Sequence, residues 1–164
     1  MKKFAALLLA LMMVIPMVAM AEVVPSPVAD AFTSASTTNY YAQYALTGDD
    51  LMNAVNGQAG TYIIVTVNPD GSPNAAVLVF AIKKLDDKYY IQLGMAENQS
   101  KANLEATGEG LAVYAVVGEG QTIASTGARI YFKAIEDQAV IDTLMQDARQ
   151  GAAFFEITEV LPLG

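Results

Sequence analysis

The chain has 164 residues, and its nine basic and seventeen acidic side chains give a formal net charge of −8. A surface this acidic repels nucleic acid and anionic membranes, which argues against both as partners. The chain also has no cysteine and no histidine. These absences exclude disulfides, the usual zinc sites, histidine-ligated haem and histidine-activated nucleophiles, and they leave carboxylate, tyrosine, lysine or cofactor chemistry.

The N-terminus has the pattern of a secretory signal peptide. Lys2 and Lys3 precede an apolar run over residues 4–18, and small residues follow at Ala19 and Ala21. The alternative, an uncleaved anchor, is disfavoured because the run is shorter than the ~20 apolar residues that span a bilayer. We therefore expect residues 1–21 to be removed by cleavage after Ala21, with export to the periplasm or the extracellular space and no membrane attachment afterwards.

Residues 22–46 are predicted to be a linker that ends in a tyrosine-rich lead-in. The linker is rich in Ala, Ser, Thr, Val and Pro and has no sustained hydrophobic period. Tyr40, Tyr41 and Tyr44 follow. Packing at the edge of the domain is the favoured role of these rings, and contact with a partner is the alternative.

The first ordered elements are a helix and a strand. A helix is predicted over residues 47–57, with Thr47 as N-cap and acidic residues in its first turn. Residues 61–67 are β-branched and aromatic throughout, which predicts a strand. Residues 68–71 read Asn-Pro-Asp-Gly, a turn composition that returns the next strand antiparallel.

A long strand is predicted over residues 74–83, and both of its faces are apolar. Such a strand is covered on both sides, by a barrel interior on one and by a cofactor, helix or second subunit on the other. The remaining elements follow in chain order: a strand over 89–95, a helix over 100–106, strands over 111–117 and 128–135, a helix over 138–149 and a strand over 153–160. About six strands with small helices predict a mainly β fold, a closed antiparallel barrel over residues 47–164.

Ser100 and Lys101 open the second of these helices. Ser100 is by itself expected to be an N-cap. A lysine in the first turn opposes the helix dipole unless an anion lies nearby, which favours a phosphate at this corner.

The ordered segments TVNPDGSPN, QSKANL and GARIYFKA, over roughly residues 47–161, resemble the FMN-binding split barrel of the pyridoxamine 5′-phosphate oxidase-like superfamily. The likeness is closest to the small FMN-binding proteins and flavin reductases of anaerobic bacteria. It implies a Greek-key split barrel that binds FMN noncovalently at the interface of a homodimer.

The resemblance also implies which residues would contact FMN. Those at the ring edge would be Asn74, Ala76, Val77 and Leu78. Backbone facing the ribityl chain and ring would come from Gly94, Met95 and Ala96. The phosphate would be held by Gln99, Ser100 and Lys101, supported by Asn103, with Arg129 as a reserve cation.

This chain departs from the superfamily in two places. Many members carry a basic or polar contact on the second strand, where this chain has apolar residues, and the Arg- and His-bearing tail of pyridoxamine phosphate oxidases is replaced by Leu-Pro-Leu-Gly. We therefore do not expect pyridoxamine phosphate oxidase activity.

Three functions follow as hypotheses. The leading one is an exported FMN-dependent oxidoreductase or electron-transfer protein whose redox partner the sequence does not name. The alternative is a non-enzymatic ligand-binding or interaction domain that kept the barrel without flavin. Haem or porphyrin binding, which the resemblance also implies, would here require a tyrosine, methionine or lysine as axial ligand.

Overall fold

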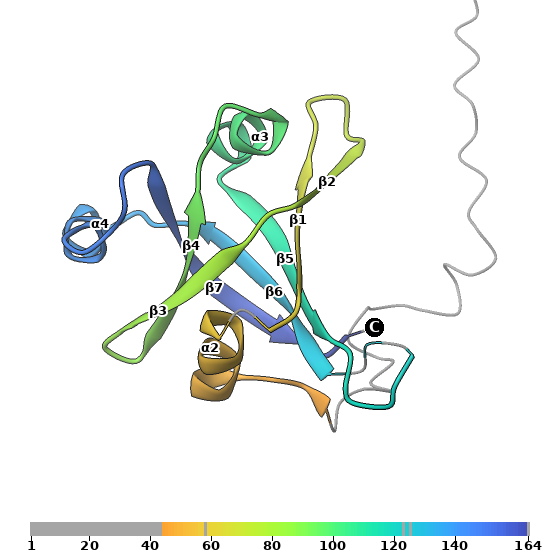
Figure 1. The fold of residues 1–164 in the computed structure, drawn as a ribbon. Coiled ribbons are helices and arrows are strands. Elements are labelled where there is room, and N and C mark those ends of the chain that lie inside the picture. Colours follow the sequence, from red (N-terminus) through yellow and green to blue (C-terminus); the bar gives the residue numbers. More distant parts are fainter. Residues whose placement is uncertain (1–43, 58, 123, 125, 164) are drawn as a thin grey trace, which may run out of the picture. The chain divides into compact units, whose positions relative to one another are not determined.

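Seven antiparallel strands and three helices make up the domain in the computed structural model, which describes residues 44–57, 59–122, 124 and 126–163 (Figure 1). The strands are β1 Thr61–Val67, β2 Pro73–Val77, β3 Phe80–Leu85, β4 Lys88–Gly94, β5 Glu109–Val116, β6 Thr126–Ala134 and β7 Ala152–Leu161. The helices are α2 Gly48–Asn56, α3 Gln99–Thr107 and α4 Gln138–Met145. The predicted signal peptide and most of the predicted linker lie outside the described residues. None of the described helices is long and apolar enough to cross a membrane.

The strands form one sheet in the order β2-β1-β5-β6-β7-β4-β3. β2 and β3 are consecutive in the chain but occupy opposite edges of the sheet, so the chain crosses between the edges at residues 78–79, as the long diagonal ribbon in Figure 1 shows. The sheet is thereby curled into a split barrel, which confirms the predicted fold class.

The prediction of one strand over residues 74–83 is wrong. Its first half pairs with β1, where Asn74 lies opposite Thr66, and its second half pairs with β4, where Phe80 lies opposite Leu93. The two halves serve different neighbours, so the ladder is interrupted between them. This break is the reason that the structure has seven strands and not six.

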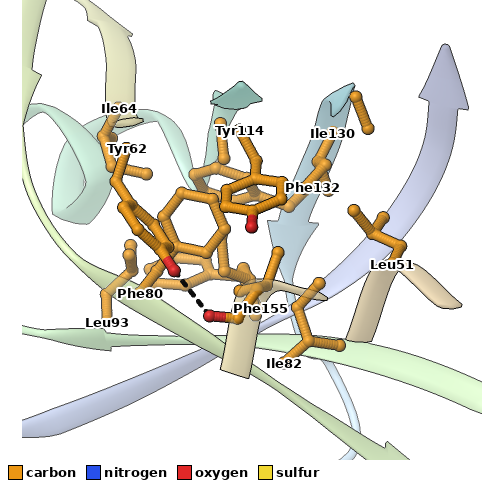
Figure 2. Close-up of a cluster of buried hydrophobic side chains, with 14 of the residues drawn as sticks. Leu51, Tyr62, Ile64, Phe80, Ile82, Leu93, Tyr114, Ile130, Phe132 and Phe155 are labelled. Carbon is orange, nitrogen blue, oxygen red and sulfur yellow. Dashed lines mark hydrogen bonds between the residues drawn. The ribbon is translucent and has the colours of Figure 1, made fainter. Parts of the chain in front are cut away.

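Aromatic and aliphatic side chains from six strands fill the barrel (Figure 2). Tyr62 packs edge-on against Phe80 with ring centroids 5.1 Å apart, and Tyr114 lies 5.2 Å from Tyr62. These pairs have the separation and tilt that aromatic rings prefer. The barrel interior is therefore occupied by packed side chains.

Helix α2 closes one end of this barrel. Its apolar side chains Leu51 and Val55 are buried in the same core. The Tyr62 hydroxyl donates to the Val55 carbonyl oxygen at 2.6 Å, and the Tyr114 hydroxyl donates to the Ala54 carbonyl oxygen at 2.9 Å. The two tyrosines thus satisfy carbonyl groups that the end of a helix leaves unpaired. Thr47 is the N-cap residue as predicted, although its side chain makes no capping hydrogen bond.

Helix α3 begins earlier than the sequence predicted. Its N-cap is Asn98, whose side-chain oxygen accepts from the Lys101 backbone N–H at 3.0 Å, and the expectation that Ser100 caps the helix is wrong. An asparagine two residues upstream is an equally good cap, and it leaves the serine free to point inward. The helix ends at Gly108, which has the left-handed φ of +71° typical of a helix C-terminus.

Helix α4 packs on the outside of the sheet, where Leu144 joins Tyr90 and Phe154 in a second, smaller apolar cluster. The predicted helix over 138–149 is too long, because turns replace it after Met145. Only Leu144 is buried among its apolar residues, so little packing energy supports a longer helix.

The outer face of β2 has no cover within the described chain, which leaves a cofactor or a second subunit as the predicted cover. The Val77 side chain is 81% exposed and the Val79 side chain is 55% exposed. The described part of a single copy therefore leaves an apolar surface open.

Candidate functional site

The predicted phosphate corner lies where the chain leaves β4 and enters α3, beside the tip of the β1–β2 hairpin (Figure 1). The tip is the predicted tight turn: the Gly71 N–H donates to the Asn68 carbonyl oxygen at 2.9 Å, and Asp70 accepts from the Ser72 N–H at 2.9 Å. This local chemistry holds the turn rigid and presents Asn68 to the helix.

A chain of hydrogen bonds joins the hairpin to α3. We call it the asparagine network, and its members are Thr66, Asn68, Asn74, Ser100 and Asn103. Asn103 is 2% exposed and donates to the Thr66 hydroxyl and to the Asn68 side-chain oxygen, both at 2.9 Å. Asn74 donates to the Thr66 hydroxyl at 3.1 Å and to the Ser100 hydroxyl at 3.0 Å. The network thus brings together three residues predicted to contact FMN.

The side chains of Asn74, Ser100 and Asn103 bond to other protein groups, and so does that of Gln99. Ser100 is only 4% exposed, and its hydroxyl faces Asn74 across the α3–β2 contact. Gln99, predicted to hold phosphate, donates to the Asn103 side-chain oxygen at 2.8 Å. Buried polar groups need partners, and here they find them within the protein.

Lys101 lies between two carboxylates. Its ammonium nitrogen is 2.7 Å from a Glu97 oxygen and 3.1 Å from a Glu105 oxygen. Hydrogen bonding to Glu97, and next to Glu105, raises the pKa of Lys101 above its usual value. The cation is present where the resemblance places it, but an incoming phosphate would compete with both glutamates.

Lys101 and Met95 line a groove of about 600 Å³ between α3 and the start of β7. Glu97 and Glu105 also line it, and the Phe155 ring contributes to its apolar part. Ala96, which follows Met95, is exposed. The structure therefore places two predicted FMN contacts in one recess with a carboxylate-flanked cation.

The predicted ring-edge residues lie around the crossing from β2 to β3. Ala76 is half-buried, Val77 is exposed, and Leu78 packs against the core. Gly94, at the end of β4, has no atom within 4 Å of the position a Cβ would take, so the surface above it is open. Gly94 and Val79 line a common groove, which places the β4 end beside the crossing.

Arg129 lies apart from this region within one chain. It is on β6, separated from β2 by β1 and β5 in the sheet, and its Nε donates to the Pro162 carbonyl oxygen at 2.7 Å. The reserve cation is therefore not brought to the phosphate corner by the fold of a single copy.

The residues fit a flavin nucleotide better on the ring side than on the phosphate side. An exposed apolar crossing next to an open glycine suits a flat ring. The corner contains the hydroxyl, amides and cation that bind phosphate, yet each already has a partner in the described chain. The described residues contain no cluster of three acidic side chains arranged to hold a metal ion.

Glu97 and Glu105 are the residues that sequence reasoning missed. Glu105 lies four positions after Lys101 on α3, a spacing at which side chains on a helix meet, so that pairing could have been predicted. Glu97 lies four positions before Lys101 but precedes the Asn98 cap, outside the helix. Thr66 gave no such signal, because its partners come from elements that are distant in the sequence.

Comparison with known proteins agrees with the fold. No protein-family model matches this sequence, and no curated protein sequence matches it either. Among solved structures, an FMN-binding protein from Syntrophomonas wolfei subsp. wolfei superposes with a TM-score of 0.52 at 18% identity, over 71% of this chain and 85% of that chain. HupZ from Group A Streptococcus superposes with a TM-score of 0.50 at 16% identity, over 72% of this chain and all of that chain. The resemblance predicted from the sequence is thus confirmed for the fold.

Proposed function

We propose, from the split-barrel fold that this chain shares with an FMN-binding protein, that it binds FMN noncovalently and acts as a flavin-dependent oxidoreductase or electron-transfer protein. When bound, the flavin supplies the redox chemistry, while the protein orients it and limits its contact with water. The observation that carries the proposal is the open backbone at Gly94 beside the exposed apolar side chain of Val79, at the place where the resemblance predicted the ribityl chain and ring.

This surface suits one face of a flavin ring. Val79 is 55% exposed and lines the same groove as Gly94, so an apolar side chain and a bare backbone adjoin each other. Flat ligands bind where apolar side chains surround a few backbone polar groups. One protomer supplies only one side of such a site.

A second copy of the chain would supply the other side. The outward face of the sheet is apolar across three neighbouring strands, since Ile63 on β1 lies opposite Val77 on β2 and Val113 on β5. Val67 continues this face and is 51% exposed. Contiguous exposed apolar surface of this kind marks interaction sites, which supports a homodimer with FMN at its interface.

The phosphate would bind by replacing Glu97 beside Lys101. Glu97 is 89% exposed in its side chain, whereas the Lys101 side chain is 24% exposed, so the carboxylate can leave while the ammonium stays in its groove. Asn103 would then hold the helix start in place through the asparagine network.

Titration of the mature chain with FMN and with riboflavin, followed by visible absorption, tests the proposal. We expect FMN to bind more tightly than riboflavin, and Lys101→Ala to weaken FMN by about 1.5–3 kcal/mol while leaving riboflavin unchanged. Glu97→Gln, which removes the competing charge, should strengthen FMN alone. If neither flavin binds at tens of micromolar, the proposal is wrong.

The second candidate function is a non-enzymatic ligand-binding or interaction domain. The specific observation in its favour is the phosphate corner, where the cation is paired twice and the amides bond each other. In a fold retained without its cofactor, the groups that once bound phosphate would pair with one another in this way. Absence of flavin binding with an intact homodimer would select this candidate.

The N-terminal pattern supports the further proposal that the protein acts after export. N-terminal sequencing of the exported protein should begin at Glu22. A mature chain that retains Lys2 and Lys3 would contradict it.

A further inference from the structure

We infer that a groove on the outer face of β3 and β4, on the side where the chain turns from α4 into β7, is an oxoanion-binding site. We call it the Lys83–Arg149 groove; it has a volume of about 560 Å³. Gly94, which the proposed function places against the flavin ring, also lines this groove, but no residue that the resemblance assigned to the FMN phosphate does. The ligand it fits is a small molecule that carries a phosphate or carboxylate group.

Small side chains on three strands make the recess. Gly94 on β4 lies opposite Ala152 on β7, and Ala81 on β3 lies opposite Gln92 on β4. All four line the groove, and three of them have at most a methyl side chain. This part of the recess is therefore lined mostly by small side chains. Among the four residues, Gln92 has the side-chain amide that can donate a hydrogen bond to a ligand.

Two cations line this recess. Lys83 comes from β3, and Arg149 comes from the turn that precedes β7. Neither makes an ion pair or a side-chain hydrogen bond with any residue that the structure describes. An arginine and a lysine that line one groove without a carboxylate partner among the described residues are the donor set that oxoanions bind.

The other lysines on the same two strands behave differently. Lys84 is 2.9 Å from an Asp49 oxygen, and Lys88 is 2.7 Å from a Glu156 oxygen. In a chain with nearly twice as many acidic as basic residues, cations would be expected to find such partners. Lys83 and Arg149 differ from these lysines because they line the same groove and have no carboxylate partner among the described residues.

The other charged and polar groups that line the groove determine its net charge. Asp147 is its single acidic residue, so two positive charges face one negative charge. Gln150 adds a second amide. Asn56 also lines the groove, but its side chain is held by the Ile82 backbone through two hydrogen bonds of 2.9 Å. The net positive charge therefore comes from Lys83 and Arg149.

The test is a titration of the flavin-free mature protein with inorganic phosphate at constant ionic strength, followed by amide NMR. We expect saturable shifts at Gln92, Gly94 and Gln150. Lys83→Gln and Arg149→Gln should each weaken phosphate binding roughly tenfold. Asp147→Asn should strengthen it, because it removes the one opposing charge, an effect that a merely structural residue would not produce.

Lys133→Gln is the matched control, since it makes the same charge change on β6, in a different groove. Phosphate shifts that do not saturate, or an equal loss of affinity in Lys133→Gln, would overturn the inference. Urea unfolding of each variant verifies that it is folded.

A second arm repeats the titration with FMN present. If FMN displaces phosphate, and Lys83→Gln weakens FMN but not riboflavin, the oxoanion is the phosphate of the flavin itself. If FMN and phosphate bind together, the groove takes a separate ligand. Both results support the site. Phosphate binding without any flavin binding would retain this inference and remove the proposed flavin function.

Discussion

Gly127 shows how a single residue constrains the barrel. A Cβ at this position would overlap the Tyr114 carbonyl oxygen on the neighbouring strand, and its φ of +154° is one that side chains rarely adopt. Its own carbonyl oxygen also accepts from the Leu46 N–H at 3.1 Å. The lead-in at Ala45 and Leu46 is therefore attached to β6, ahead of the predicted start of the domain at residue 47.

We predict that Gly127→Ala destabilises the protein by about 1–3 kcal/mol, because β5 and β6 must separate to admit the methyl group. Gly94→Ala is the control, since it has open space around the added carbon. Urea unfolding measures both variants. Equal midpoints for the two would show that the close approach is not structurally required.

At the scale of elements, the asparagine network fixes α3 to the β1–β2 hairpin. The helix itself carries little amphipathic pattern, and Leu104 is the apolar residue that it buries. Its position therefore depends on polar side chains, chiefly the buried Asn103. Networks of this kind specify position well but are costly to leave incomplete.

We predict that Asn103→Ala costs about 1–3 kcal/mol of stability, because it leaves the Asn68 side-chain oxygen and the Gln99 amide without their partner. Gln99→Ala removes a single bond from an exposed side chain and should cost less. Thermal unfolding of the two variants checks the order. A larger loss for Gln99→Ala would contradict it.

At the scale of the whole molecule, the apolar outer face of the sheet is the surface on which the proposed homodimer rests. We predict that Val77→Lys, at a side chain 81% exposed in one copy, converts a dimer to a monomer. Met145→Lys places the same charge on α4, at a side chain 41% exposed, and should leave the dimer intact. Analytical ultracentrifugation distinguishes the two species. A monomeric parent protein would remove the dimer proposal.

The buried tyrosines make the stability of the protein fall at alkaline pH. Burial raises the pKa of Tyr114, and burial followed by the charge of Tyr114 raises the pKa of Tyr62, both above the ordinary value of 10.0. The unfolded chain therefore ionises first, so the stability they contribute is full below pH 10.0 and is lost as the pH rises through the folded values.

We predict that the urea midpoint falls above pH 10.0 and that Tyr114→Phe reduces this fall, although it also removes the hydrogen bond to Ala54. Urea titrations below and above pH 10.0 measure the difference. A Tyr114→Phe variant with an unchanged pH dependence would show that ionisation of this ring does not limit stability.

The sequence predicted the sheet more completely than the site. Hydrophobic alternation located nearly every strand, and the composition of residues 68–71 identified the turn at the hairpin tip. Composition also excluded whole classes of chemistry by the absence of cysteine and histidine. Alternation and turn composition depend on neighbours in the sequence, and the absence of a residue type does not depend on the fold at all. The sequence therefore predicts all three without knowledge of the tertiary structure.

Only the tertiary structure decided which groups meet. It divided the strand at residues 78–79, because the two halves pair with β1 and β4 at opposite edges of the sheet. It placed the Ser100 hydroxyl against Asn74, and it made Asn98 the N-cap of α3. It also brought Lys83 and Arg149 to one groove. Such pairings join residues far apart in the sequence, and no local periodicity reports them.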